Sequence, residues 1–387
     1  MYGLTSSRVN SLHRRMVFRF IWKRQYTSRP EISRVFGFSK STVSGIIQSL
    51  EDDGLVMVSG LSQNAPSGRK AELLSINPEG PKVVSILLKD TGEIDAALLS
   101  LRGKVIGREQ DFLSQKTPEY AVQRVLELIR SLAPFSTILG VGIGLPGIVD
   151  HLRGRIEYSA HFQWRDVPFG EMVQRGIPYP VFVENRTVAA TLGETWFGKG
   201  LESRNLVCLH CGDTLGAGIV IGEKIYRGNL LGAGEVGHIP VAQAQETLCS
   251  CGRRGCAETV VGFPAIMEKL KEPYQNEHDA FCFLRDHRDD PRVRSLLEEA
   301  FVVVGEVTAI LLNILAPEKV IFAGALPRVS PSFFLDFVVR VVAKKALTPI
   351  FQKVSLELSL LGEEEEALWG QAVVMERLFA MNYPLGG

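Results

Sequence analysis

Four side chains in one short segment have the types and the spacing of a zinc site. His238, Cys249, Cys251 and Cys256 supply one imidazole and three thiols within nineteen residues. Zn²⁺ is borderline-soft and takes imidazole and thiolate together, and four protein ligands make a closed structural site. The alternative is a loop with incidental free cysteines. Since three of the six cysteines of the chain fall here, the segment predicts structural zinc.

The same segment has a longer pattern. From Gly234 to Glu258 the sequence is GEVGHIPVAQAQETLCSCGRRGCAE, which contains GExGH followed by CxCGxxGCxE. This pattern resembles the ROK family of bacterial sugar kinases and related sugar-responsive repressors, and the resemblance covers nearly the whole chain. It implies that zinc holds a loop that shapes a sugar site. It also implies that Glu235, His238 and Glu258 contact sugar hydroxyls, with His238 serving as a metal ligand too.

Position 186 departs from the active kinases that the chain resembles. Those kinases have Glu-Asn-Asp, in which the Asp is the general base, whereas this chain has Glu184-Asn185-Arg186. A guanidinium stays protonated at physiological pH and cannot accept the proton of a sugar hydroxyl. Loss of a general base slows a reaction by roughly 10²–10⁴-fold. We therefore expect no catalytic residues and no sugar phosphorylation.

The loops that would face ATP phosphates also depart from the kinase pattern. Glu93 and Asp95 follow the first turn, where they would bring negative charge toward a triphosphate. The second loop, Gly212–Gly218, carries another acid at Asp213, and the adenosine-side Gly-Gly is replaced by Ala323-Gly324-Ala325. Glycine lets backbone amides approach phosphate, and carboxylates repel it. Together the three changes argue against tight ATP binding.

The ligand of such a cleft is predicted from the polar residues that remain. Asn185 keeps a sugar contact of the resembled family, and His161 stands where relatives have Asn. Our hypothesis is that Arg186, together with His161, binds an anionic group such as that of a sugar phosphate or acid sugar, since guanidinium pairs bidentately with such groups. The alternative is that Arg186 forms a salt bridge to Glu184 or Glu235 in a vestigial pocket.

Charge is distributed unevenly along the chain. Residues 1–70 contain eleven Lys and Arg against four Asp and Glu, a balance of +7, and the remainder has a balance of −7. A basic head on an acidic body is typical of a polyanion-binding module joined to a sensor or enzyme.

The basic head has the pattern of a helix-turn-helix. Residues 8–24 have helical periodicity, a second helix begins at about Pro30, and Ser39 is a good N-cap for a third. The third helix buries an apolar stripe, and its opposite face is small and polar, as a major-groove helix requires. The DNA-binding candidates on this helix are Lys40, Ser41, Thr42, Ser44 and Gln48.

Two strands and a basic loop follow, which predicts a wing. The strands are Leu55–Val58 and Ala71–Ile76, and the loop between them ends in Arg69 and Lys70, which we expect at phosphates or in the minor groove. The predicted winged helix-turn-helix domain spans residues 1–77 and binds double-stranded operator DNA. The alternative is a three-helix module that binds protein instead.

The body, residues 81–387, has the element order of an α/β fold. Strand-like runs at Val83–Lys89, Ile94–Leu101 and Val105–Asp111 precede a helix at Pro118–Leu132 and a strand at Leu139–Leu145. The resemblance implies a two-lobed ribonuclease H-like body of the actin, sugar kinase and Hsp70 type. Its lobes would be roughly 81–190 plus the C-terminal helix, and 191–370. Farther on, the acids of Glu363–Glu366 predict a solvated helix start.

Composition narrows the cellular setting. The longest apolar runs are too short to span a bilayer, and arginines interrupt any signal-peptide core. Metal-type cysteine spacing without a secretion signal favours the reducing cytoplasm. We therefore expect a cytoplasmic, sugar-responsive transcriptional regulator, a repressor that acts as a homodimer or a tetramer. The alternatives are an active zinc-containing sugar kinase and a regulator controlled by a protein partner.

Overall fold

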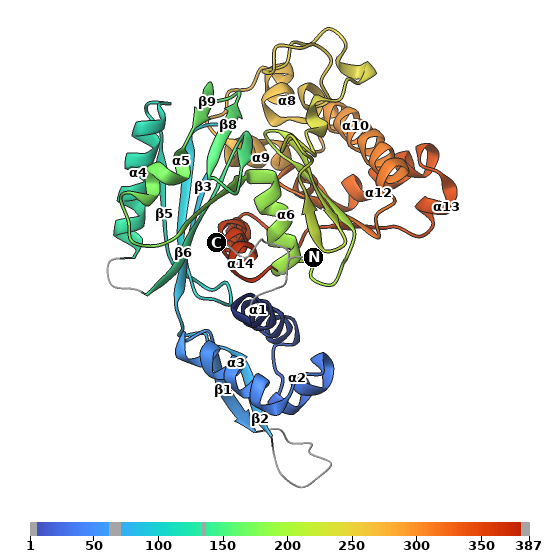
Figure 1. The fold of residues 1–387 in the computed structure, drawn as a ribbon. Helices are drawn as coiled ribbons and strands as arrows, with labels where there is room; N and C mark the ends of the chain where they lie inside the picture. The colour runs from blue at the N-terminus through green and yellow to red at the C-terminus, as the bar shows by residue number, and fades with distance from the viewer. Residues whose placement is uncertain (1–5, 62–70, 134–136, 381–387) are drawn as a thin grey trace.

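The computed structural model describes residues 6–61, 71–133 and 137–380. Figure 1 shows a small head at one end of a larger, two-lobed α/β body. The head contains α1 (Ser6–Arg24), α2 (Arg29–Phe36), α3 (Lys40–Asp52), β1 (Val56–Leu61) and β2 (Glu72–Ile76). The two strands pair antiparallel, as a wing requires. The predicted helices and strands of the head are therefore confirmed, although β1 runs three residues farther than the predicted Leu55–Val58.

Short-range capping sets the turn between the head helices. The Ser28 side chain accepts from the backbone N–H of Glu31 at the start of α2, and that of Ser39 accepts from Thr42 at the start of α3. Gly37 ends α2 with φ of 69°, a left-handed conformation that glycine adopts without strain. On α2, Ile32 is fully buried, whereas Val35 is 49% exposed.

The first lobe is a five-stranded sheet in the order β10-β6-β3-β4-β5. It is covered on its outer face by α4 and α5, beside a small three-stranded sheet, β7-β8-β9 (Figure 1). The elements are β3 (Lys82–Leu88), β4 (Glu93–Leu99), β5 (Val105–Phe112), α4 (Pro118–Leu132), β6 (Ile138–Leu145), β7 (Ile148–Asp150), β8 (Arg155–Ser159), β9 (Trp164–Val167), α5 (Phe169–Gln174) and β10 (Val181–Asn185). The strands and the helix predicted in this region are present.

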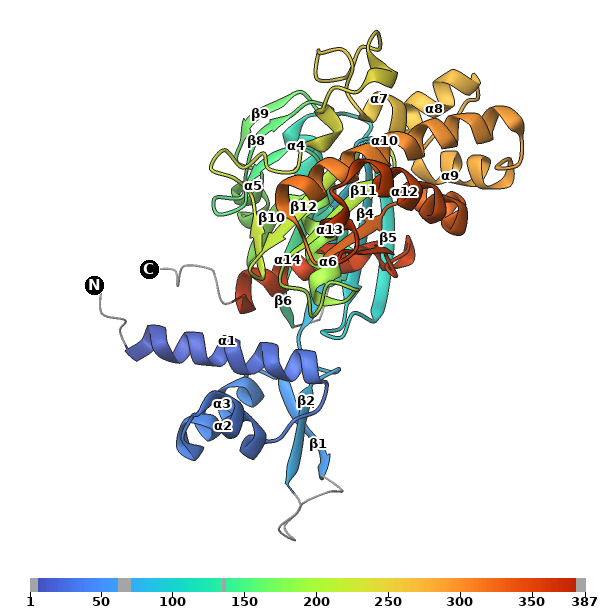
Figure 2. The ribbon, with the colours of Figure 1, turned by 90° about the vertical axis from the view of Figure 1, so that its right-hand side faces the viewer.

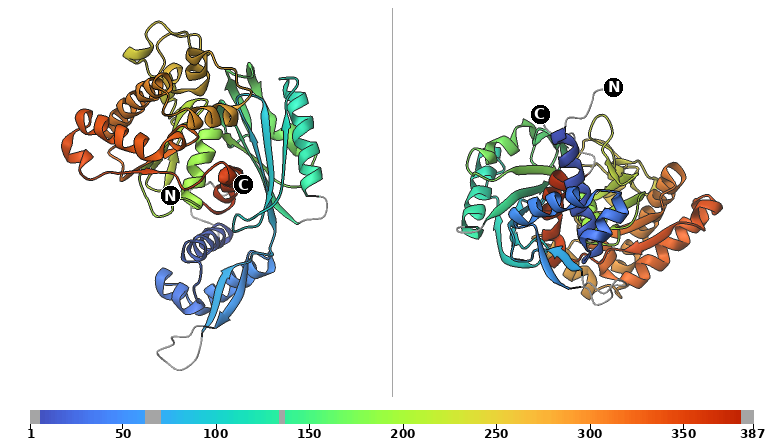
Figure 3. Two further views of the ribbon diagram at one scale, coloured as in Figure 1. Left: turned by 180° about the vertical axis from the view of Figure 1, so that it is seen from behind. Right: turned by 60° about the horizontal axis from the view of Figure 1, so that its bottom comes forward.

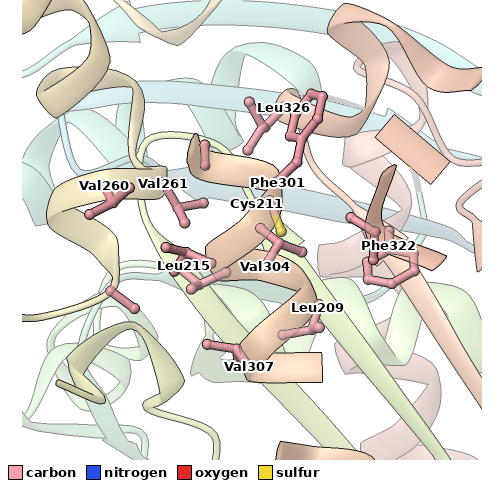
Figure 4. Close-up of a cluster of buried hydrophobic side chains, with 14 of the residues drawn as sticks. Leu209, Cys211, Leu215, Val260, Val261, Phe301, Val304, Val307, Phe322 and Leu326 are labelled. Atoms are coloured by element: carbon pink, nitrogen blue, oxygen red, sulfur yellow. The ribbon is translucent and has the colours of Figure 1, made fainter. Parts of the chain in front are cut away.

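The second lobe contains another five-stranded sheet, in the order β13-β12-β11-β14-β15. Its strands are β11 (Leu206–Cys211), β12 (Leu215–Ile221), β13 (Lys224–Tyr226), β14 (Lys319–Ala323) and β15 (Ser355–Leu358). The long helix α10 (Pro291–Leu315) lies along this sheet. Figure 4 shows Phe301, Val304 and Val307 of α10 packed against side chains of β11 and β12, which holds the sheet and its loops in place.

Shorter helices complete the second lobe. These helices lie around α10 and the sheet, and the cysteine-rich segment runs between three of them (Figure 2). They are η1 (Val236–His238), η2 (Ala242–Ala244), α7 (Glu258–Val261), α8 (Phe263–Leu270), α9 (Glu277–Asp286), α11 (Leu326–Val329), α12 (Pro331–Lys345), α13 (Thr348–Phe351) and η3 (Glu364–Glu366). Within the described residues, no helix has both the length and the apolar character needed to cross a membrane.

Two helices pack together between the sheets, α6 (Arg186–Trp196) and the C-terminal α14 (Ala367–Phe379). α14 also packs against β3 and β6 of the first sheet. The approach is close, because a Cβ on Gly142 would lie 1.9 Å from the carbonyl oxygen of Gly370. Figure 3 shows from behind that α14 lies at the base of the body, directly above α1 of the head.

Candidate functional site

A cavity of about 600 Å³ opens between the two lobes, within the size range of small-molecule sites. It is bounded by the β6–β7 turn, the β10–α6 junction, the start of β12 and the cysteine-rich segment. All six predicted ligand-contact residues line it, namely Asn185, Arg186, Glu235, His238, Glu258 and His161. The chain therefore gathers into one cavity side chains that lie up to 97 positions apart in the sequence.

The β10–α6 junction fixes the position of Asn185. Its side-chain oxygen accepts from the backbone N–H of Val188 at 3.0 Å, which caps α6, and its amide donates to the Gly147 carbonyl at 2.8 Å. An N-cap satisfies one of the free N–H groups at a helix start. Asn185 therefore holds the start of α6 against the β6–β7 turn, while its side chain faces the cavity.

Arg186 is paired with Asp90, which neither the anion-binding hypothesis nor its alternative named. Its guanidinium Nη2 lies 3.2 Å from Oδ2 of Asp90, and both side chains are nearly inaccessible to solvent. Burial alone would lower the pKa of Arg186, but the surrounding carboxylates, Asp90 first, raise it above its ordinary value. The predicted alternative of a salt bridge to Glu184 or Glu235 is wrong in its partner.

His161 meets the same carboxylate. Its Nε2 lies 3.3 Å from Oδ1 of Asp90, so Asp90 lies between His161 and Arg186. Glu184 pairs elsewhere, because Arg227 of the second lobe places its Nη2 2.6 Å from Oε2 of Glu184. The cationic side chains of this part of the cavity therefore have internal counter-ions.

The cysteine-rich segment brings the four predicted metal ligands together. One possible ligand atom from each of His238, Cys249, Cys251 and Cys256 lies within 4.8 Å of all the others. Cys249 Sγ is 3.6 Å from His238 Nδ1, and Cys251 Sγ is 3.7 Å from Cys256 Sγ, without a disulfide. Ligands about 2.3 Å from a tetrahedral zinc are separated by about 3.8 Å. The donor set and its spacing therefore fit Zn²⁺.

Glu258 links this cluster to the cavity. Its Oε1 lies 2.8 Å from Cys249 Sγ and 3.6 Å from His238 Nδ1, at the first residue of α7. Glu235 lies on the other side of His238, with Oε2 3.9 Å from His238 Nε2. Both carboxylates line the cavity, so the cysteine-rich segment sets the positions of three of the predicted contact residues.

Beyond Arg186, a cluster of charged side chains fills the region of the predicted phosphate loops. Glu277 Oε1 accepts from the backbone N–H of Asp213 at 3.2 Å. Gly212 makes this possible, since a Cβ there would lie 2.0 Å from the same oxygen. The Glu277 carboxylate therefore takes the hydrogen bond that this loop N–H can donate. The neighbouring cavity at Lys89 and Glu366 measures about 10 Å³, and about 10–15 Å³ is needed for one water.

Burial and crowding change the titration of this cluster. Burial, with the nearby Glu277 carboxylate, raises the pKa of Asp213 to about 8, and in the described residues neither Asp213 carboxylate oxygen has a hydrogen-bond partner. Burial also raises the pKa of Glu366 to about 7, although Lys89 lies 3.9 Å away and opposes that shift. Burial lowers the pKa of His210 to about 4.

Two sequence-based expectations about acids are wrong for one residue each, Asp95 and Glu366. Asp95 does not face a phosphate loop, because it is buried and accepts from Arg108 on the neighbouring strand β5. Glu93 is paired with Lys89 at 3.3 Å. Glu366, expected at a solvated helix start, is buried against Lys89, whereas Glu364 and Glu365 of the same run are exposed as predicted. Periodicity within the run does not reveal that contact.

The head presents the predicted surface of α3. Lys40, Ser41, Ser44 and Gln48 are exposed, while the apolar stripe of α3 faces α1 and α2. Thr42 is half-buried, its hydroxyl 2.9 Å from that of Ser39. This surface can enter a major groove without displacing core residues. The wing candidates Arg69 and Lys70 lie outside the described residues.

Sequence reasoning missed three cavity and cluster residues. The first is Asp90, which pairs with Arg186. The second is Arg227, which pairs with Glu184. The third is Glu277, which accepts a hydrogen bond from the backbone N–H of Asp213. Asp90 had a signal, since it stands in the turn that precedes Glu93, in the first of the loops predicted to face phosphate. The other two come from distant segments and had no local signal.

Comparisons with known proteins give relatives over nearly the full length of the chain. A putative xylose repressor of Caldicellulosiruptor sp. (strain Rt8B.4) is 28% identical over 96% of this chain and 97% of its own length. The crystal structure of a ROK family transcriptional regulator, a homologue of the E. coli MLC protein, aligns with a TM-score of 0.78 and 24% identity, over 95% of this chain and 98% of that one.

The body alone is also similar to a kinase. A ROK family glucokinase from Streptomyces griseus, solved with glucose and AMPPNP, aligns with a TM-score of 0.65 and 22% identity, over 75% of this chain and 97% of its own. At these identities the two structures show the fold: a winged helix-turn-helix head on a kinase-like body. The family model that matches residues 90–376 is that of the ROK family, and the chain therefore belongs to the ROK family.

Proposed function

We propose that this protein is a sugar-responsive transcriptional repressor that does not phosphorylate its sugar. The carrying observation is the buried ion pair between Asp90 and Arg186 at the edge of the cavity, where a kinase of this family would hold its base. Arg186 cannot accept a proton, and its pairing with Asp90 keeps it ionised. The relatives described as xylose repressors, similar over nearly the whole chain, support the regulatory assignment.

The ligand that fits the cavity best is a neutral monosaccharide. Arg186 is already neutralised by Asp90, and Arg227 by Glu184, so an anionic group gains less from them than from free cations. Glu235 and Glu258 add negative charge to the lining and can accept hydrogen bonds from sugar hydroxyls. D-xylose is the first sugar to test, followed by D-glucose.

Zinc would have a structural role in this protein. The residues that would hold it are His238, Cys249, Cys251 and Cys256, and as a closed four-ligand site it would supply rigidity to the loop and no catalysis. The rigid loop would then keep Glu235, His238 and Glu258 at the cavity wall.

The head would bind operator DNA in the cytoplasm, as a homodimer or a tetramer. The exposed face of α3 would enter the major groove, with Lys40, Ser41, Thr42, Ser44 and Gln48 at bases or phosphates. Arg69 and Lys70 of the wing would add contacts to phosphates or the minor groove. A two-fold dimer matches a palindromic operator and doubles the contact area.

Two measurements on purified full-length protein test this proposal. Calorimetry with D-xylose, D-glucose and glucose 6-phosphate should show a neutral sugar binding more tightly than the phosphate. A coupled assay for ADP release with the same sugars and ATP should stay at background. Turnover at an ordinary kinase rate, about 1–100 per second, would contradict the absence of phosphorylation. Tighter binding of glucose 6-phosphate than of either neutral sugar would contradict the proposal that the ligand is neutral.

A further inference from the structure

α6 reaches from the cavity to the DNA-binding head. Its first residue, Arg186, lines the cavity, and its last residue, Trp196, contacts α1. The indole Nε1 of Trp22 on α1 donates to the backbone carbonyl of Trp196 at 2.9 Å, and the two rings lie edge to face at 5.6 Å. A displacement of the helix start therefore reaches α1 along a single rigid element.

α14 makes a second connection of the same kind. It begins after Glu366, which is buried at Lys89 beside the cleft. It ends at Phe379, whose ring stacks on Phe18 of α1 with centroids 3.8 Å apart. In Figures 1 and 2, α1 lies beneath the ends of both helices. We call Phe18, Trp22, Trp196 and Phe379 the aromatic joint.

The two helices are fastened to each other near the joint. Trp196 Nε1 donates to Glu376 Oε2 on α14 at 3.1 Å, and both side chains are buried. α14 itself has little freedom against the first sheet, because Gly370 touches Gly142 through backbone atoms. Close-packed interfaces of this kind move as units and do not deform continuously.

We propose that α6 and α14 transmit the state of the cavity to the head through the aromatic joint, so that sugar binding changes the orientation of α3 for DNA. This inference rests on the proposed function. A ligand can shift the head only by binding one arrangement of the lobes better than another. The pair of helices supplies the physical link, since both begin beside the cleft and both end on α1.

The test uses Trp22→Phe, with Trp164→Phe as the matched control. Both tryptophans are 4% exposed, and each donates its indole N–H to a backbone carbonyl, that of Trp196 or that of Lys116. Trp164 lies in the first lobe, away from the joint. The probe is a fluorescent duplex that the wild-type protein has selected from a random-sequence pool. Its affinity is measured by anisotropy with and without saturating D-xylose or D-glucose, whichever sugar binds.

In wild-type protein and Trp164→Phe, we expect sugar to change the duplex affinity by roughly 5–150-fold, the usual range of allosteric coupling. In Trp22→Phe the change should fall to less than half of the wild-type change on a logarithmic scale, while sugar affinity from calorimetry stays within about twofold. Equal coupling in Trp22→Phe and wild type overturns the inference alone. A wild-type protein whose duplex affinity ignores both sugars overturns the proposed function, and the inference with it.

A second variant guards against misfolding of Trp22→Phe. Arg102, half-buried after β4, donates to the Trp22 carbonyl at 3.3 Å and places its guanidinium over the Trp22 ring. Arg102→Gln removes this support without opening the core. It should also reduce the coupling while leaving the far-ultraviolet circular dichroism unchanged. Wild-type coupling in folded Arg102→Gln and in folded Trp22→Phe would show that the joint does not carry the signal.

Discussion

Asp90 determines how the cavity presents Arg186 to a ligand. The carboxylate lies 3.2 Å from the guanidinium and 3.3 Å from the ring of His161, so one acid contacts both residues that the sequence suggested for binding an anion. A buried charge is retained only when it is paired. The same side chain that stabilises Arg186 therefore lowers its value as a phosphate contact.

Removal of that acid should change ligand preference. In Asp90→Asn, Arg186 loses its counter-ion, and glucose 6-phosphate should bind at least about tenfold more tightly than to wild type, since a charge-assisted hydrogen bond contributes about 1.5–3 kcal/mol. Calorimetry measures this. Asp111→Asn is the control, because it breaks a similar pair, with Arg124, at the far edge of the sheet. Unchanged affinity in Asp90→Asn would show that Arg186 does not face the phosphate.

The metal ligands allow a second test of single residues. Purified wild-type protein should contain about one zinc per chain by elemental analysis, and Cys256→Ser should lose it, because a closed site requires four ligands. Its melting temperature should fall, since metal binding contributes directly to folding. Cys282→Ser, on α9 outside the cluster, should keep both the zinc and the melting temperature. Zinc retained in Cys256→Ser would contradict the assignment.

At the scale of elements, α3 is an amphipathic helix whose apolar stripe is buried inside the head. Its exposed face can therefore be changed without disturbing its fold. Gln48 lies in the middle of that face and donates to Asp52 one turn later at 2.8 Å.

Gln48→Glu should weaken binding of the selected duplex by about 5–150-fold, the effect of losing one base contact worth about 1–3 kcal/mol. Repulsion from DNA phosphates adds to that loss. Gln123→Glu on α4 is a close control, because Gln123 is also exposed and donates to a carboxylate one turn later, at 3.0 Å. Anisotropy titrations at one salt concentration compare the two. Equal affinity in both variants would remove α3 from the DNA interface.

Several of these elements could be predicted because their signals are local. Ser39 caps α3 through its third following residue, and the helix Pro118–Leu132 has the predicted bounds. The cysteine cluster also lies within one short segment. The pairs Asp90–Arg186 and Lys89–Glu366 could not be predicted, because they join residues 96 and 277 positions apart. Such contacts depend on the order of strands in the first sheet and on where α14 packs against it, which periodicity does not specify.

At the scale of the whole molecule, the charged cluster between the lobes should make stability depend on pH. Glu366 and Asp213 have raised pKa values in the folded protein, about 7 and about 8, so the folded state holds protons that the unfolded state has released. Their contribution to the free energy of unfolding is complete below the pKa values of the unfolded chain. It is lost as pH rises through the pKa values of the folded protein. His210, whose pKa is lowered to about 4, acts in the opposite direction below pH about 6.5.

The melting temperature should therefore fall between pH 6.5 and pH 8.5, by an amount on the order of a few degrees. Scanning calorimetry or circular dichroism measures it. Glu366→Gln has no carboxyl group to ionise at this position and should show a smaller fall in melting temperature. Glu364→Gln, exposed and two residues away, should behave as wild type. A melting temperature that rises over this interval in wild type would contradict the assigned protonation.

The hydrogen bond from the backbone N–H of Asp213 to Glu277 has a consequence for engineering. An exchange of Arg186 for aspartate would supply a proton acceptor in the cavity, yet it would leave Asp90 without this cation and the Asp213 N–H still bonded to Glu277. Conversion to a phosphotransferase would also require changes at Glu277 and Glu366, which line the small neighbouring cavity. A backbone donor of this loop is thus bound by a side chain of the protein's own interior.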